Sequence, residues 1–70
     1  MTGAEFIRRI RRLGRRRGIR AFFDETRGKG SHGTLVFGDR FTVVKDRKKE
    51  LSKGLLKAMC DQLGIRLQDL

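Results

Sequence analysis

The stretch Gly28-Lys29-Gly30-Ser31-His32-Gly33 holds the only histidine of the chain, among glycines and beside a lysine. Histidine is the side chain whose unperturbed pKa, about 6.5, lets it accept and release protons near neutral pH. Glycines such as Gly28 and Gly30 let a backbone approach a ligand closely. This combination suits proton transfer beside a phosphate, although clusters of Gly, Ser and Lys between apolar runs are usually plain loops. The rest of the chain must decide between these two interpretations.

The charge balance indicates a polyanionic partner. The chain has 18 Lys and Arg residues against 8 Asp and Glu, a net charge of +10, and a pI near 11.4. Nucleic acid is the first candidate for such a protein. A basic amphipathic helix can also lie on an anionic membrane. The second basic block, in residues 41–57, and the β-rich segment between the blocks favour nucleic acid over a membrane.

Length and cysteine content narrow the class further. Residues 1–70 are enough for one domain only. Cys60 is the single cysteine, so we expect neither an intrachain disulfide nor a cysteine-based zinc site, as in a reducing cytoplasm. With no second histidine and no carboxylates at ligand spacing, we expect no metal and no cofactor. No apolar run approaches the ~20 residues that span a bilayer, which predicts a cytoplasmic protein.

The first element to position the histidine is a helix. Thr2 followed by Glu5 is a capping box, which predicts a helix start. Gly18, after three arginines, predicts its end, while Gly14 weakens the helix and makes that end less certain. One apolar stripe runs along this helix, and arginines cover the remaining circumference: Phe6, Ile7, Ile10 and Leu13, against Arg8, Arg9, Arg11, Arg12, Arg15 and Arg16.

Three strands and a second helix follow. The apolar and β-branched runs 19–23, 32–37 and 40–44 predict an antiparallel meander, whose second turn is Gly38-Asp39 in the type II′ form. Ser52 is the expected N-cap of the second helix and Gly64 its end. Residues 65–70 form a tail without a predicted structure. An apolar stripe on the second helix faces the core: Leu55, Leu56, Met59, Cys60 and Leu63.

The predicted fold class is therefore α+β, in the order α-β-β-β-α. Two amphipathic helices would cover one face of a three-stranded antiparallel sheet, as in the double-stranded RNA-binding domain. His32 would open the middle strand, at the margin of the sheet, where its side chain can face solvent.

The run from Gly28 to Ile65, GKGSHGTLVFGDRFTVVKDRKKELSKGLLKAMCDQLGI, resembles the HicA family of bacterial type II toxins, which act as mRNA interferases. The resemblance rests on Gly30-Ser31-His32 before the middle strand, on the strand-turn-strand that follows, and on Lys-Glu-Leu-Ser-Lys-Gly-Leu-Leu at the start of the second helix. It implies an endoribonuclease with a double-stranded-RNA-binding-like fold, the catalytic histidine at His32, an mRNA substrate, and neutralisation by a HicB-like antitoxin. Many members carry a second histidine directly after the catalytic one, where this chain has Gly33.

We assign the roles as follows. RNA supplies its own nucleophile, the 2′-OH, so cleavage needs a base and cations rather than a metal. His32 is the expected general base, and Lys29, Lys53 and Lys57 the expected phosphate contacts. Ser31 forms the turn or orients the imidazole. The antitoxin would present an acidic surface to these cations.

Two other classes remain open. A non-catalytic RNA-binding module would use the same charge and fold, but it would not depend on His32. A DNA-binding repressor is less favoured, because nothing in the sequence indicates a helix-turn-helix.

Overall fold

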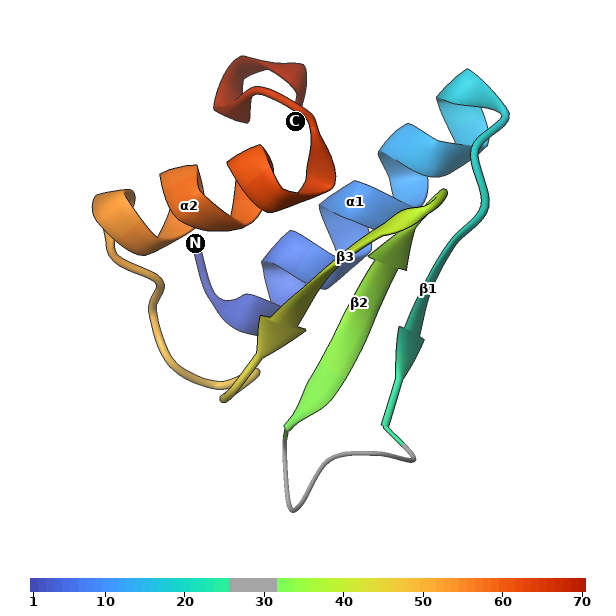
Figure 1. Cartoon of the computed structure of the whole chain (residues 1–70). Helices are drawn as coiled ribbons and strands as arrows, with labels where there is room; N and C mark the ends of the chain where they lie inside the picture. Colours follow the sequence, from blue (N-terminus) through green and yellow to red (C-terminus); the bar gives the residue numbers. More distant parts are fainter. Residues whose placement is uncertain (26–31) are drawn as a thin grey trace.

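The computed structural model describes residues 1–25 and 32–70. In this part of the chain the elements follow the predicted order α-β-β-β-α, with a short 3₁₀ helix at the end. The three strands form one antiparallel sheet in the order β1-β2-β3, and both helices pack on it (Figure 1). The elements are α1 (Gly3–Arg17), β1 (Ala21–Asp24), β2 (Gly33–Phe37), β3 (Arg40–Val44), α2 (Lys53–Leu63) and η1 (Leu67–Asp69).

Helix α1 begins and ends where the sequence predicts. Thr2 is its N-cap, and the Thr2 Oγ1 atom accepts a hydrogen bond from the Glu5 amide at 3.2 Å. The second bond of the predicted capping box, from the Thr2 amide to the Glu5 carboxylate, is replaced by an ion pair. The Glu5 carboxylate lies 3.1 Å from the Arg9 guanidinium. Gly18 ends the helix with a φ of 68°, a left-handed conformation that glycine adopts without strain.

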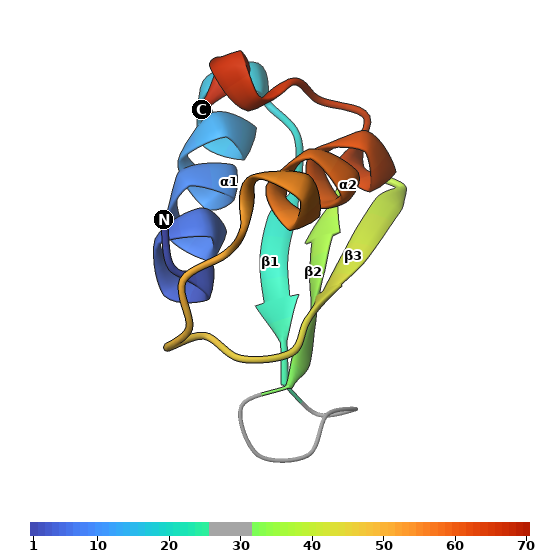
Figure 2. The ribbon, with the colours of Figure 1, turned by 90° about the vertical axis from the view of Figure 1, so that its left-hand side faces the viewer.

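The core lies between the sheet and the helices (Figure 2). One member of the predicted apolar set is exposed, and one residue outside that set is buried. Leu55, at the margin of the α2 stripe, is 49% exposed, whereas Ile65 of the tail is buried, with 6% exposure. Cys60 is buried as predicted, and this burial raises the pKa of its thiol. The largest fully buried side chains include Phe6, Ile10 and Leu13 of α1, Leu35, Thr42 and Val44 of the sheet, and Cys60 and Leu63 of α2.

The β2–β3 hairpin fixes the register of the sheet. Phe37 pairs with Arg40 across the two-residue turn, and Gly33 pairs with Val44 at the far end. Gly38 has a φ of 65° and Asp39 does not have a positive φ, the combination found in a type II′ turn. The observed β2 starts one residue after His32. Strand β1 starts at Ala21 rather than Ile19, because the Ile19 amide bonds back to the Gly14 carbonyl of α1.

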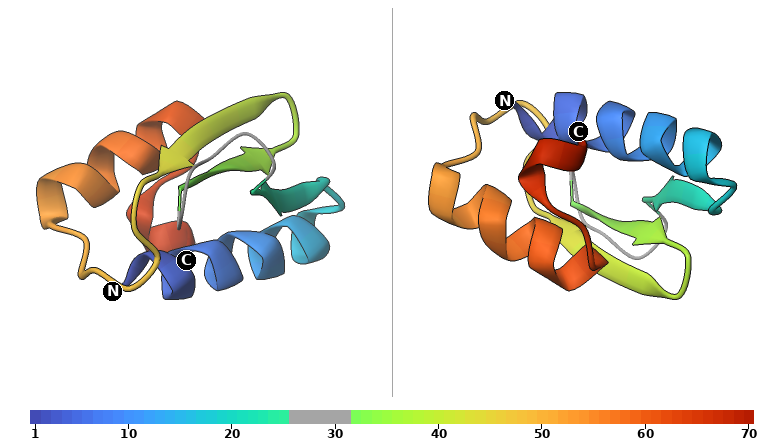
Figure 3. Two further views of the ribbon diagram at one scale, coloured as in Figure 1. Left: turned by 90° about the horizontal axis from the view of Figure 1, so that it is seen from below. Right: turned by 90° about the horizontal axis from the view of Figure 1, so that it is seen from above.

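The connector, residues 45–52, is held against the start of α1. The Gly3 amide donates to the Lys49 carbonyl at 3.2 Å, and the Ala4 amide donates to the Arg47 carbonyl at 2.9 Å. The first amides of a helix have no partner within the helix, so the connector supplies one for each of these two. The Leu51 amide in turn donates to the Met1 carbonyl, which places the N-terminus beside the connector (Figure 3).

The C-terminal residues, which had no predicted structure, pack on the other end of α1. The Asp69 carboxylate lies 3.3 Å from the Arg17 guanidinium, and its backbone carbonyl accepts a bond from Arg16. None of the described helices is both long and apolar enough to cross a bilayer.

Candidate active site

His32 lies directly before β2 and is exposed to solvent. The last pair of the β2–β3 ladder is Gly33 with Val44, and one further step in the same antiparallel register would put His32 opposite Lys45. The hairpin thus places the imidazole at the end of the sheet where β3 leaves for the connector. This agrees with the predicted position of a solvent-facing histidine at the margin of the sheet.

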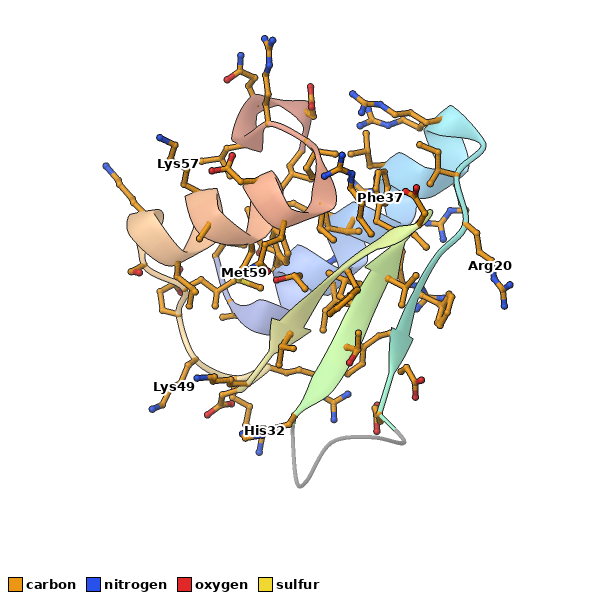
Figure 4. The ribbon with its side chains drawn as sticks, viewed as in Figure 1. Arg20, His32, Phe37, Lys49, Lys57 and Met59 are labelled. Carbon is orange, nitrogen blue, oxygen red and sulfur yellow. The ribbon has the colours of Figure 1, made fainter. Side chains whose placement is uncertain are left out.

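A groove of about 470 Å³ opens beside the imidazole. His32 lines it together with two lysines of the connector, Lys45 and Lys49, and with two carboxylates, Asp46 and Glu50. Its apolar wall comes from β3, the connector and α2. In Figure 4, His32 and Lys49 lie at the same end of the molecule, next to one another in the view. We call this the His32 groove.

The carboxylates of the His32 groove already have partners. The Glu50 carboxylate pairs with the α-amino group of Met1, and Asp46 Oδ1 accepts a hydrogen bond from the Lys48 amide at 2.9 Å. Within the described residues, Lys49 forms no ion pair with a protein carboxylate. Its exposed ammonium is therefore available to an anion that enters the groove.

Chemically, the groove combines a proton acceptor with two lysine ammonium groups. A neutral imidazole can take a proton from a hydroxyl within hydrogen-bond reach, and ammonium groups stabilise negative charge that develops beside it. A phosphodiester next to a ribose hydroxyl presents both of these features.

Several predicted site residues cannot be placed. Gly28, Lys29, Gly30 and Ser31 lie outside the described residues, so their predicted roles stay predictions.

Lys53 and Lys57 are placed, but they do not line the His32 groove. Both lie on exposed positions of α2, beside a different groove lined also by Cys60 and Arg66. Helical residues two positions apart point in nearly opposite directions, so the helix that turns Leu55 toward His32 turns these lysines away. Figure 4 shows Lys57 extending from α2 on the side of the molecule away from His32.

The residues that sequence reasoning missed are Lys45 and Lys49. They belong to a run of charges that reads as an ordinary connector. A signal was nonetheless present in the hairpin register. Counting outward from the two-residue turn pairs residue 37 with 40 and 33 with 44, and one further step in the same register would put His32 opposite Lys45.

The chain was compared with protein-family models, with curated proteins and with solved structures, and none of them matches it. In the part of the chain that the structure describes, no three His, Cys, Asp or Glu residues gather in a way that could hold a metal ion.

Proposed function

We propose that this chain is a metal-independent endoribonuclease, the mRNA-cleaving toxin of a HicA-like type II toxin–antitoxin pair, acting in the cytoplasm. The observation that carries the proposal is the exposed imidazole of His32, in one groove with Lys45 and Lys49. The sequence resemblance at Gly30-Ser31-His32 supports the same assignment.

In the proposed reaction, His32 accepts the proton of a ribose 2′-OH. The 2′ oxygen attacks the adjacent phosphorus, the bond from phosphorus to the 5′ oxygen breaks, and a 2′,3′-cyclic phosphate forms. The connector lysines stabilise the additional negative charge of the pentavalent transition state. The leaving 5′ oxygen takes its proton from a lysine or from water. One general base contributes about 10²- to 10⁴-fold, so we expect slow turnover.

The proposed partner is a HicB-like antitoxin that covers the His32 groove. The net charge of +10 calls for an acidic surface on that partner. Attraction between opposite charges would also speed its association, and salt would slow it.

The deciding experiment compares the purified wild-type protein with His32→Ala on an unstructured RNA. We expect the variant to lose cleavage while keeping the thermal unfolding midpoint of the wild type, because the side chain is exposed. The wild-type products should end in 2′,3′-cyclic phosphate and 5′-OH, and excess chelator should leave the rate unchanged. Cleavage by His32→Ala at the wild-type rate would show that the base lies elsewhere.

A non-catalytic RNA-binding module is the second candidate. The position of Lys53 and Lys57, away from His32, favours it, because phosphate contacts for binding alone need no base nearby. In that case RNA affinity would fall in Lys53→Ala/Lys57→Ala, no cleavage would be detected in the wild type, and His32→Ala would bind RNA as the wild type does.

A further inference from the structure

A second groove, of about 580 Å³, lies between α1 and β1. Four arginines, three from α1 and one from the connector, line it together with Phe22 and Phe23 of β1. The spacing of the helical arginines, three and four residues apart, puts them on one face of α1. We call this the arginine groove; its arginines are Arg8, Arg11, Arg15 and Arg47.

Protein carboxylates offset only part of the charge of these arginines. Two of the four groove arginines have carboxylate partners: Arg47 pairs with Glu25, which also lines the groove, at 2.8 Å, and Arg8 pairs with Glu5 of the same helix at 3.8 Å. Among the described residues, neither Arg11 nor Arg15 forms an ion pair, and both are exposed. Clustered like charges repel one another and oppose the compact state unless an anion relieves them. The groove therefore suits a polyanion.

The aromatic rings distinguish a nucleic acid strand from other polyanions. The guanidinium of one groove arginine, Arg47, lies over the Phe23 ring, 5.4 Å from its centre. Arg20, which does not line the groove, has its guanidinium 4.9 Å from the centre of the Phe22 ring. Unpaired bases stack on such rings and guanidinium planes, while neighbouring arginines hold the phosphates. In a duplex the bases are paired and stacked inside the helix. Only its phosphates can then contact a groove of this kind.

The connector borders both grooves. Asp46 lines the His32 groove, and the next residue, Arg47, lines the arginine groove. A strand that leaves His32 can therefore cross the connector and continue between α1 and β1. Resting on the proposed ribonuclease function, we infer that the arginine groove binds an unpaired stretch of the RNA substrate next to the bond that is cut. The substrate is then single-stranded RNA rather than a duplex.

The test measures binding without cleavage, in the His32→Ala background, with a short fluorescein-labelled oligouridylate as the probe. Arg11→Ala/Arg15→Ala removes two groove arginines. Arg12→Ala/Arg16→Ala is the matched control, because it removes the same charge at the same spacing from the same helix, outside the groove. Thermal unfolding confirms that both variants are folded.

We expect the groove variant to bind about tenfold more weakly, with a salt slope smaller by about 1.4, since each phosphate contact of a single strand contributes about 0.7. The control should lose no more than about twofold by the same long-range charge effect. Annealing the probe to oligoadenylate should weaken binding, because the paired bases can no longer stack on the groove.

Equal losses in the two variants, or a preference for the duplex, would overturn the inference. A third outcome would also overturn it: the groove variant binds RNA normally, but a co-expressed antitoxin no longer neutralises it. The groove would then be a protein interface. These are binding measurements, so their outcome does not depend on the proposed ribonuclease activity. If His32 proved not to be the catalytic base, the comparison of the two variants would still test whether the arginine groove binds RNA.

Discussion

The ring of Phe23 occupies the space that a side chain on Gly33 would need. A Cβ atom built on Gly33 would lie 2.3 Å from Phe23 Cζ and 2.9 Å from the Asp24 carbonyl oxygen. The aromatic ring and the backbone of β1 therefore leave no room for a larger side chain at position 33.

Gly33→Ala should therefore destabilise the fold by about 1–3 kcal/mol, the usual cost of overpacking, because the Phe23 ring must move. Gly54→Ala is the control, since nothing lies within 4 Å of a Cβ atom at this position on α2. Alanine there should stabilise by up to about 1 kcal/mol through its higher helix propensity. Chemical denaturation measures both, and equal stability of the two variants would contradict the packing argument.

Lys49→Ala should slow RNA cleavage by roughly ten- to a hundredfold, because a positive charge next to the reacting phosphate stabilises the transition state. Lys48→Ala is the neighbouring control, since Lys48 does not line the His32 groove. The bond from Gly3 to residue 49 uses the backbone carbonyl and survives the replacement. Single-turnover cleavage rates of the two variants test this prediction. Equal slowing in both variants would show that Lys49 does not stabilise the transition state.

Glu25→Gln should raise affinity for single-stranded RNA by roughly two- to fivefold. The change frees Arg47 from an exposed ion pair, which is worth up to about 1 kcal/mol, and removes a negative charge from the arginine groove. Asp39→Asn, at the hairpin turn, removes the same charge outside that groove. Fluorescence anisotropy in the His32→Ala background measures both. An equally large gain in RNA affinity in Asp39→Asn would show that the effect comes from the net charge of the protein and not from the arginine groove.

Asp69→Asn should lower stability in a way that depends on pH. The Arg66 amide, which donates to Asp69 Oδ2 at 2.9 Å, and then the charge of Arg17 hold the pKa of the Asp69 carboxyl below its usual 3.8. A lowered pKa means that the folded state favours the ionised form. The contribution is therefore complete above pH 3.8 and is lost as the pH falls through the lower pKa of the folded state.

We accordingly expect the thermal midpoint of the wild type to exceed that of Asp69→Asn at neutral pH, and the gap to close below pH 3.8. A gap that stays constant across this range would mean that the carboxylate charge is not what holds η1 to α1.

Much of the fold followed from local signals. The caps Thr2, Gly18, Ser52 and Gly64 and the Gly38-Asp39 turn determined the element boundaries to within a few residues. The contacts that the sequence did not reveal join distant segments. From the sequence, Gly14 was expected only to weaken the first helix. In the structure a Cβ atom at this position would lie 2.6 Å from the Ile19 carbonyl oxygen. The glycine therefore lets the chain turn back closely over α1.

The candidate site was predicted less completely than the fold. His32 could be singled out because it is the only imidazole. Its lysine neighbours depend on hairpin register and on the path of the connector, and helical geometry turns Lys53 and Lys57 away. Composition gives the number of cations in a chain, but only the tertiary fold determines which of them face the same ligand.

The connector that carries Arg47 and Lys49 also supplies the carbonyls that bond the Gly3 and Ala4 amides. Fraying of the first helical turn and movement of these two cations are therefore linked equilibria. A strand of RNA that steadies the connector should lengthen the lifetime of that turn, so slower hydrogen exchange at the Gly3 and Ala4 amides would report that the grooves are occupied.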